Sequence, residues 1–258
     1  MLSIGLGSQP TTECGIFGSY QCLELDGNSD YVNLPSGLMN RLNPNAGTIS
    51  AWVDLRDNDG ASSQNIVRLA NDASGDTMGL QFHRAHTEFR GVYKLGGVYK
   101  EATYNDPSLD LAGYMDQGWI FLAMTWESDG AGTGEVKMYF NGALYETASQ
   151  PNNWDTNNSI DIARIGANND ATGGFADGFI DQVAIFNITK GADDISGMYS
   201  TSKPNDLTTF QLNPTTNGLY TPRGLIGYYQ FEGNANDSSA NNFHGTLIGT
   251  AGFNSTQP

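Results

Sequence analysis

Basic residues are scarce in this sequence. Lys and Arg together number 12 against 28 Asp and Glu, so the formal net charge is −16. A surface this acidic disfavours electrostatic binding to nucleic acid or to an anionic membrane, and we expect neither as a partner. Cations suit it better, although such acidity also serves solubility alone.

Cysteines and long apolar runs are also limited. Cys14 and Cys22 are the two cysteines. They are too few for a zinc site, and they either close a short disulfide loop or stay reduced. The sequence contains no run of about 18 apolar residues that could span a membrane. The opening stretch MLSIGLGSQPTTECG lacks the basic and apolar regions of a signal peptide, so we expect no membrane insertion.

Familiar catalytic motifs are missing too. The sequence has no GxSxG nucleophile elbow, no HExxH zinc motif and no glycine-rich phosphate loop. Two of its three histidines, His83 and His86, lie three positions apart in HRAH. Such a pair faces opposite sides of a strand, and it could hold a metal only if a tight turn intervened.

Alternating apolar and polar residues run through most of the 258 residues. They are bounded by Gly, Asn, Asp and Ser clusters, as in an all-β chain. Antiparallel strands in this number close a barrel or stack two sheets, and the long uneven loops favour a jelly-roll sandwich. WIFLAMTW (119–126) and FIDQVAIF (179–186) are apolar on both faces, which predicts central strands. Residues 192–200 alone have helical spacing.

Three segments are predicted along the chain. Residues 1–200 form the sandwich body, and residues 201–222, rich in Thr, Asn and Pro, look like a tether. Residues 223–258 contain an apolar strand, a polar turn and a second alternating stretch, which together predict a hairpin. A lone hairpin is marginal in water, so we expect it to complete the sandwich of its own or of a neighbouring subunit.

Four ordered segments resemble a laminin G-like domain of the concanavalin A-like lectin/glucanase superfamily. They are LELDGNSDYVNL (23–34), GTISAWVDLRD (47–57), WIFLAMTWES with GEVKMYFNGALYE (119–146) and GFIDQVAIFNITKGADDISGMY (178–199). In that family a stretch like GLIGYYQFEGNANDSSANNFHGTL (224–247) comes first, whereas here it comes last. The resemblance therefore implies a concanavalin A-like jelly roll with a permuted or exchanged C-terminal hairpin, or the start of a second repeat.

The resemblance also bears on function. Glycoside hydrolases of the superfamily carry three acids alternating along one strand, whereas this sequence offers only Glu24 and Asp26 there. We therefore expect a non-catalytic binding or structural module that adheres to glycans or proteins on a surface. A virion component, such as a phage capsid-decoration or fibre protein, fits best, with a homo-oligomer or capsid as partner. The alternatives are a secreted bacterial adhesin, a carbohydrate-binding domain or a glycan-degrading enzyme, and the expected location is a virion surface or extracellular.

Two sets of site residues are predicted. Asp26 and Asp30 project from a Gly-containing turn, and Asp181 interrupts an apolar strand. Similar sandwiches hold a structural Ca²⁺ in such a region, which implies these three ligands. Capping of the turn by its own aspartates is the alternative. For a sugar, exposed aromatic rings beside polar groups are the expected platforms, and they are Tyr93, Tyr99, Tyr104 and Trp154.

Overall fold

The computed structural model describes residues 21–56, 63–96, 98–105, 113, 118–128, 134–150, 159–199, 206–212 and 219–254. The strands of this part of the chain are β1 (Cys22–Asp26), β2 (Tyr31–Asn33), β3 (Ala46–Leu55), β4 (Ser63–Ala70), β5 (Thr77–His83), β6 (Glu88–Leu95), β7 (Val98–Tyr104), β8 (Ile120–Glu127), β9 (Gly134–Phe140), β10 (Ala143–Gln150), β11 (Ile162–Ile165), β12 (Asp177–Phe186), β13 (Gln211–Leu212), β14 (Leu219–Tyr220), β15 (Leu225–Tyr229), β16 (Thr246–Ile248) and β17 (Gly252–Asn254). The short helices are α1 (Ser36–Met39), the 3₁₀ turn η1 (Arg84–His86) and α3 (Ala192–Met198).

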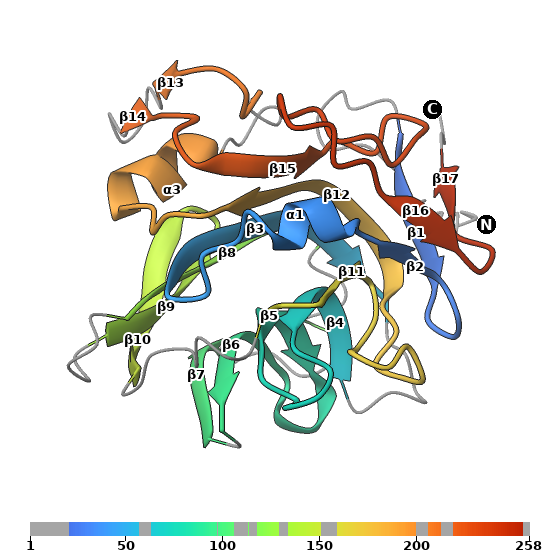
Figure 1. Ribbon diagram of the computed structural model, residues 1–258, viewed down its shortest axis with the longest axis horizontal. Coiled ribbons are helices and arrows are strands. Elements are labelled where there is room, and N and C mark those ends of the chain that lie inside the picture. Colours follow the sequence, from blue (N-terminus) through green and yellow to red (C-terminus); the bar gives the residue numbers. More distant parts are fainter. Residues whose placement is uncertain are drawn as a thin grey trace, which may run out of the picture.

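Two antiparallel sheets stack face to face, which confirms the predicted all-β sandwich (Figure 1). Within the described residues the larger sheet has the order β10-β9-β8-β3-β12-β1-β17, and β15 also pairs with β12. The opposing sheet has the order β16-β2-β11-β4-β5-β6-β7. Alternating side chains from both sheets, such as Val53, Leu80 and Ile180, fill one buried core between them.

The two central strands of the larger sheet are buried on both faces. β3 and β12 each run for ten residues, and their inward side chains enter the core between the sheets. Their outward side chains, among them Trp52 and Phe186, form a second apolar cluster with Ile195 and Met198 of α3. The prediction of an apolar central strand at 179–186 and of a short helix near 192–200 is thus confirmed.

Part of the predicted tether belongs to this second cluster. Leu207 and Tyr220 are 3% and 0% exposed, and the Tyr220 hydroxyl donates a hydrogen bond to the Leu207 carbonyl. β13 and β14 pair with each other beside α3. The described parts of this segment therefore cover the outer face of the larger sheet. Their apolar residues are too few and too widely spaced to predict a packed element.

The C-terminal segment does not fold as the predicted hairpin. β15 pairs with β12 in the larger sheet, whereas β16 pairs with β2 in the opposing sheet and β17 pairs with β1. Residues between β15 and β16 carry the chain across the end of the sandwich, and Phe231 is buried there at 1% exposure. The apolar side chains therefore gain more burial by completing two sheets than by pairing with each other.

A buried carboxylate fixes this crossing. Asp237 accepts backbone N–H bonds from Tyr228 (2.9 Å), Ser239 (2.8 Å) and Phe243 (2.8 Å). It also accepts the Ser239 hydroxyl at 2.8 Å. Since buried backbone donors need acceptors, this one side chain satisfies three of them in the crossing.

Cys22 is buried at the start of β1 and is disulfide-bonded. Cys14, the other cysteine of the sequence, lies outside the described residues. Among the helices that the structure describes, none has the length and apolar character needed to cross a membrane.

Candidate functional site

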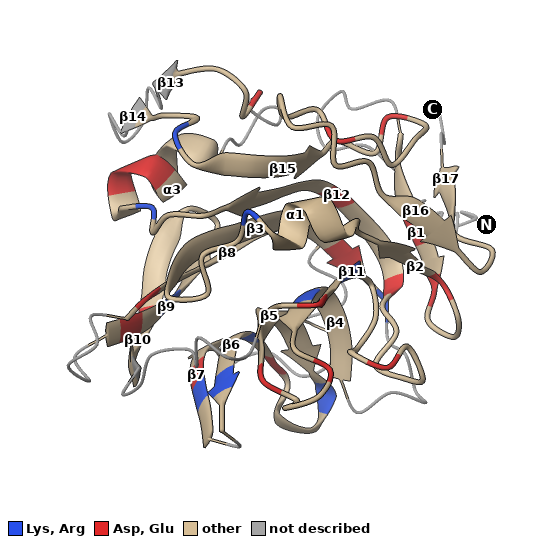
Figure 2. Cartoon of the chain, in the orientation of Figure 1, with Lys and Arg blue, Asp and Glu red and all other residues tan. Residues whose placement is uncertain are grey.

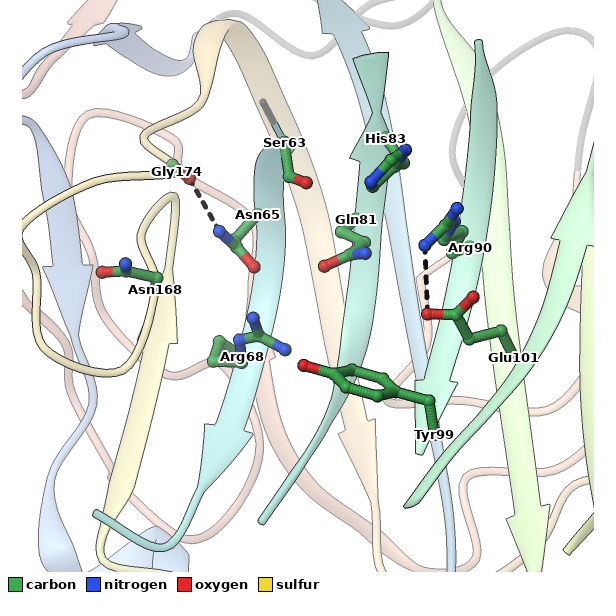
Figure 3. Close-up of a pocket in the computed structure, with 10 residues that line it drawn as sticks. All are labelled: Ser63, Asn65, Arg68, Gln81, His83, Arg90, Tyr99, Glu101, Asn168 and Gly174. Atoms are coloured by element: carbon green, nitrogen blue, oxygen red, sulfur yellow. Dashed lines mark hydrogen bonds and ion pairs between the residues drawn. The ribbon is translucent and has the colours of Figure 1, made fainter. Parts of the chain in front are cut away.

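A pocket of about 510 Å³ opens on the opposing sheet, the one that contains β4 to β7, on the face turned away from the core (Figure 3). Its described lining comes from four adjacent strands and one loop: Ser63, Asn65 and Arg68 of β4, Gln81 and His83 of β5, Arg90 of β6, Tyr99 and Glu101 of β7, and Asn168 and Gly174 of the loop after β11. Side-chain alternation explains this arrangement. Leu80 and Phe82 enter the core, so their neighbours Gln81 and His83 must face outward.

The loop between β11 and β12 forms one wall of the pocket. The Asn65 side-chain amide donates to the Gly174 carbonyl at 2.8 Å, and the Asn65 backbone N–H donates to the same carbonyl at 2.9 Å. Arg164 of β11 donates to the Asn168 carbonyl at 2.9 Å. Gly174 has φ +58, and a Cβ there would meet the Asn65 amide. The wall is therefore anchored to the sheet by its own backbone.

Tyr99 supplies an aromatic surface in the pocket. Its side chain is 54% exposed, and in Figure 3 the phenol points toward Arg68. The Lys94 ammonium lies 5.1 Å from the ring centroid. A second pocket of about 230 Å³ adjoins the first, and Arg68, Tyr99 and Asn168 line both. A ligand longer than one ring could therefore cross from one pocket to the other.

The other predicted aromatic platforms are placed differently. Tyr93 is 1% exposed in the core and donates its hydroxyl to the Pro44 carbonyl at 3.1 Å, so it cannot receive a ligand. Tyr104 stacks on Phe140 with ring centroids 3.7 Å apart and packs against the core. Both occupy inward positions of their strands, which the polar neighbours in the sequence concealed. Trp154 lies outside the described residues.

Basic side chains in the pocket differ in their partners. Arg90 bonds Glu101 at 3.0 Å and Glu88 at 2.6 Å. Arg68 donates to the Thr77 hydroxyl at 3.0 Å, and its buried Nε has no hydrogen-bond acceptor. Burial lowers the pKa of Arg68 from its usual value, and the nearby Tyr99 opposes this change. A guanidinium nonetheless remains protonated at neutral pH.

His83 and His86 lie side by side because a turn separates them. Residues Arg84–His86 form the 3₁₀ turn η1, and the two imidazole centroids are 4.7 Å apart. Together with Glu88, they place potential metal ligands within 4.8 Å of one another. The Arg90 guanidinium lies among these groups, with Nη2 2.8 Å from His86 Nδ1. A metal ion bound by these groups would therefore have to displace the contacts of Arg90 with His86 and Glu88.

The electrostatics of His83 follow from this neighbourhood. Burial is the largest cause that lowers its pKa, and the positive charge of Arg90 adds to it. Its imidazole is therefore neutral at physiological pH, and its buried Nδ1 has no hydrogen-bond partner in the structure.

The three aspartates predicted as calcium ligands are held separately. Asp26 accepts N–H bonds from Asn28 (2.9 Å), Ser29 (3.0 Å) and Asp30 (3.2 Å), which is the capped turn of the alternative prediction. Although burial raises the pKa of Asp26, the three hydrogen bonds outweigh that effect and lower it. Among the described residues, the three aspartates do not form a set of ligand atoms within 4.8 Å.

Asp30 and Asp181 each accept hydrogen bonds from other residues of the chain. Asp30 is 2% exposed and accepts the backbone N–H and the hydroxyl of Thr250. Asp181 is fully buried in β12, and its Oδ1 accepts the N–H of Gln182 at 2.8 Å. A calcium ion bound by all three would require these contacts to rearrange, and calcium binding by the chain stays a prediction.

Sequence reasoning found Tyr99 but missed most of its neighbours. Arg68, Gln81 and Asn65 stand at polar positions of alternating strands, where solvent exposure is the ordinary explanation. The available signal was the repetition of large hydrogen-bonding side chains at outward positions of consecutive strands.

Comparison with known proteins identifies the family to which the fold belongs. Residues 26–196, about two thirds of the chain, match the family model described as the Concanavalin A-like lectin/glucanases superfamily. A search of curated proteins found no match.

Two solved structures share the architecture. One is a Bacteroides ovatus protein provisionally described as carbohydrate-binding, with a TM-score of 0.59 and 13% identity over 95% of this chain and 61% of that protein. The other is the NanB sialidase from Streptococcus pneumoniae, with a TM-score of 0.51 and 18% identity over 77% of this chain and 32% of the sialidase. This chain spans less than two thirds of either protein, and the likeness concerns the fold alone.

Proposed function

Because the chain belongs to the concanavalin A-like lectin/glucanases superfamily, we propose that it is a non-catalytic module that binds glycans in the pocket over β4, β5, β6 and β7. The fold itself occurs both in binding proteins and in glycan-degrading enzymes, so the site has to carry the proposal. The observation that carries it is Tyr99, a half-exposed ring set among amide, hydroxyl and guanidinium groups.

This combination suits a sugar for two physical reasons. The apolar face of a pyranose gains by covering an aromatic ring, and its hydroxyls need donors and acceptors around the rim. Gln81 offers both kinds of group, and Asn168 adds a second side-chain amide to the lining.

The arrangement of carboxylates supports a binding role over hydrolysis. Glycosidases usually place two carboxyl groups about 5–9.5 Å apart around the scissile bond. Among the described residues that line the larger pocket, Glu101 is the single carboxylate, and it pairs with Arg90. A glycan-degrading enzyme is therefore the less favoured candidate.

A glycan-array screen of the full chain tests the proposal, with Tyr99→Ala as the variant. We expect binding to at least one glycan family, and we expect the variant to lose about fivefold or more in affinity, as for loss of an aromatic contact of about 1 kcal/mol. Tyr145→Ala is the matched control, since Tyr145 on β10 is 50% exposed and lies outside the pocket lining. Equal losses in both variants, or no binding by the wild type, would refute the proposal.

A finer proposal concerns where the module is displayed. A virion surface, as a capsid-decoration or fibre component, suits the net charge of −16 and a sandwich whose terminal strands could be exchanged between copies. A secreted adhesin is the alternative. Peptide mass spectrometry of density-purified particles and of the particle-free medium separates the two, since recovery only from the medium would exclude the virion.

A further inference from the structure

In the described part of the chain, Arg68 has no carboxylate partner, whereas Arg90 and Arg56 each have at least one. Arg90 pairs with Glu88 and Glu101, and Arg56 pairs with Glu24 at 3.1 Å. No carboxylate of the described residues lies within 4.0 Å of the Arg68 guanidinium, whose single protein acceptor there is the neutral hydroxyl of Thr77. A guanidinium has five N–H donors, so several remain for another molecule.

One of those donors is already desolvated. The Arg68 Nε is buried and has no acceptor in the structure. A buried donor without a partner costs about 1–3 kcal/mol, so the protein maintains an unfavourable group in the wall of an open pocket. A buried atom is out of reach of a ligand as well, so an acceptor that enters the pocket would bond the terminal Nη groups of the guanidinium.

The charge around the pocket also differs from that of the rest of the chain. Residues 63–104 contain five of the 12 Lys and Arg but only four of the 28 Asp and Glu. Figure 2 shows basic residues on β6 and β7, next to the pocket. Lys94 and Arg68 both line the smaller pocket. Among its described lining residues, Asp170 supplies the one carboxylate. Here an otherwise acidic protein can accept an anion.

We infer that the glycan bound in this pocket carries an anionic group, a carboxylate or a sulfate, and that Arg68 receives it beside the ring stacked on Tyr99. This inference rests on the proposed function and specifies its ligand class. Charged acceptors make stronger hydrogen bonds to guanidinium than neutral hydroxyls do, and a carboxylate matches its planar fork. A neutral sugar would leave the charge of Arg68 without a counterion.

Oligogalacturonides and their methyl esters form a matched pair of probes, because esterification removes the charge and keeps the sugar backbone. Sulfated galactan oligomers and their desulfated forms make the second pair. Titration calorimetry with the full chain at moderate ionic strength should show at least tenfold tighter binding to the charged member of one pair. The pair that shows the difference identifies the anionic group as carboxylate or sulfate.

Two variants connect the preference to Arg68. Arg68→Gln should reduce affinity for the charged probe about tenfold or more, the loss of one charge-assisted bond, and should reduce affinity for its neutral counterpart much less. The affinity of Arg68→Lys for the charged probe should lie between those of the wild type and of Arg68→Gln, since Lys keeps the positive charge but lacks the planar guanidinium. Arg41→Gln is the control for net charge, because Arg41 is exposed and lies outside both pocket linings.

The outcomes separate this inference from the proposed function. If charged and neutral members bind equally while Tyr99→Ala abolishes binding, the anionic ligand is refuted and the glycan pocket stands. If Arg68→Gln retains the preference for the charged member, the role of Arg68 is refuted. If no probe binds and the glycan array is also blank, both are refuted. Unfolding curves of the variants should match the wild type, since Arg68 makes one described side-chain hydrogen bond.

Discussion

Asp237 and Asp26 make a pair of aspartates whose mutation isolates the effect of burial. Each accepts three backbone N–H bonds, Asp237 in the C-terminal crossing and Asp26 in the turn after β1. Asp237 is 5% exposed, whereas Asp26 is exposed. Replacing either residue by Ala removes the same number of acceptors for backbone donors, but water can reach only the donors around Asp26.

We expect unequal costs from the two substitutions. Each buried N–H left without an acceptor costs about 1–3 kcal/mol, and these costs are not fully additive, so Asp237→Ala should destabilise by about 3–5 kcal/mol. Asp26→Ala resembles the loss of an exposed cap and should cost about 1 kcal/mol. For a domain of this size, 1 kcal/mol corresponds to about 2–4 °C in Tm, so the first variant should melt roughly 10 °C lower.

Urea unfolding followed by tryptophan fluorescence, with circular dichroism as a second probe, measures both free energies of unfolding. A valid comparison needs equal m-values for the two variants, which shows that each unfolds from the same folded state. Losses of equal size would refute the argument that burial of the Asp237 network determines its contribution.

Three further predictions concern the cluster around Arg90 and calcium. Because burial and the charge of Arg90 lower the pKa of His83, the unfolded chain binds that proton more tightly, and stability should fall as pH drops below about 6.5. His83→Gln should flatten this slope between about pH 7 and 5, and an unchanged slope would exclude His83 as its source. Arg90→Ala should be destabilised, since Glu88 loses its cation, and added Zn²⁺ should raise the Tm of this variant but not of the wild type. An equal effect of Zn²⁺ on both proteins would show that Arg90 does not prevent metal binding. The calcium prediction expects a higher Tm with added Ca²⁺ than with a chelator, and identical curves would reject it.

The fold could be predicted from the sequence because its information is local. Alternation identified most strands, and the runs that are apolar on both faces identified β8 and β12 as interior strands of the larger sheet. Which strands pair is not local information. The stretches of β15 and β16 have the alternation of a hairpin, yet the core at the end of the sandwich draws them into different sheets.

The site was only partly predictable for a related reason. Tyr99 stood out as an aromatic ring in a polar stretch, but Tyr93 stood out equally and proved to be core. One residue of register decides between the two faces of a strand, and polar neighbours do not fix it. Arg68 had no signal of its own, since its place in the pocket lining and its lack of a nearby carboxylate are properties of the assembled sheet.

The pairing of the two chain ends has a consequence for how the protein is made. Asn254 donates to Glu24 across 230 positions, and Thr250 donates to Asp30 across 220. Synthesis proceeds from the N-terminus, so β1 and β2 emerge from the ribosome long before β17 and β16 can pair with them. Until those later strands emerge, the edges of β1 and β2 and the adjoining stretch of β12 are left open to other strands. Strands β15, β16 and β17 therefore close the domain, and a nascent chain stalled before them would be prone to aggregate.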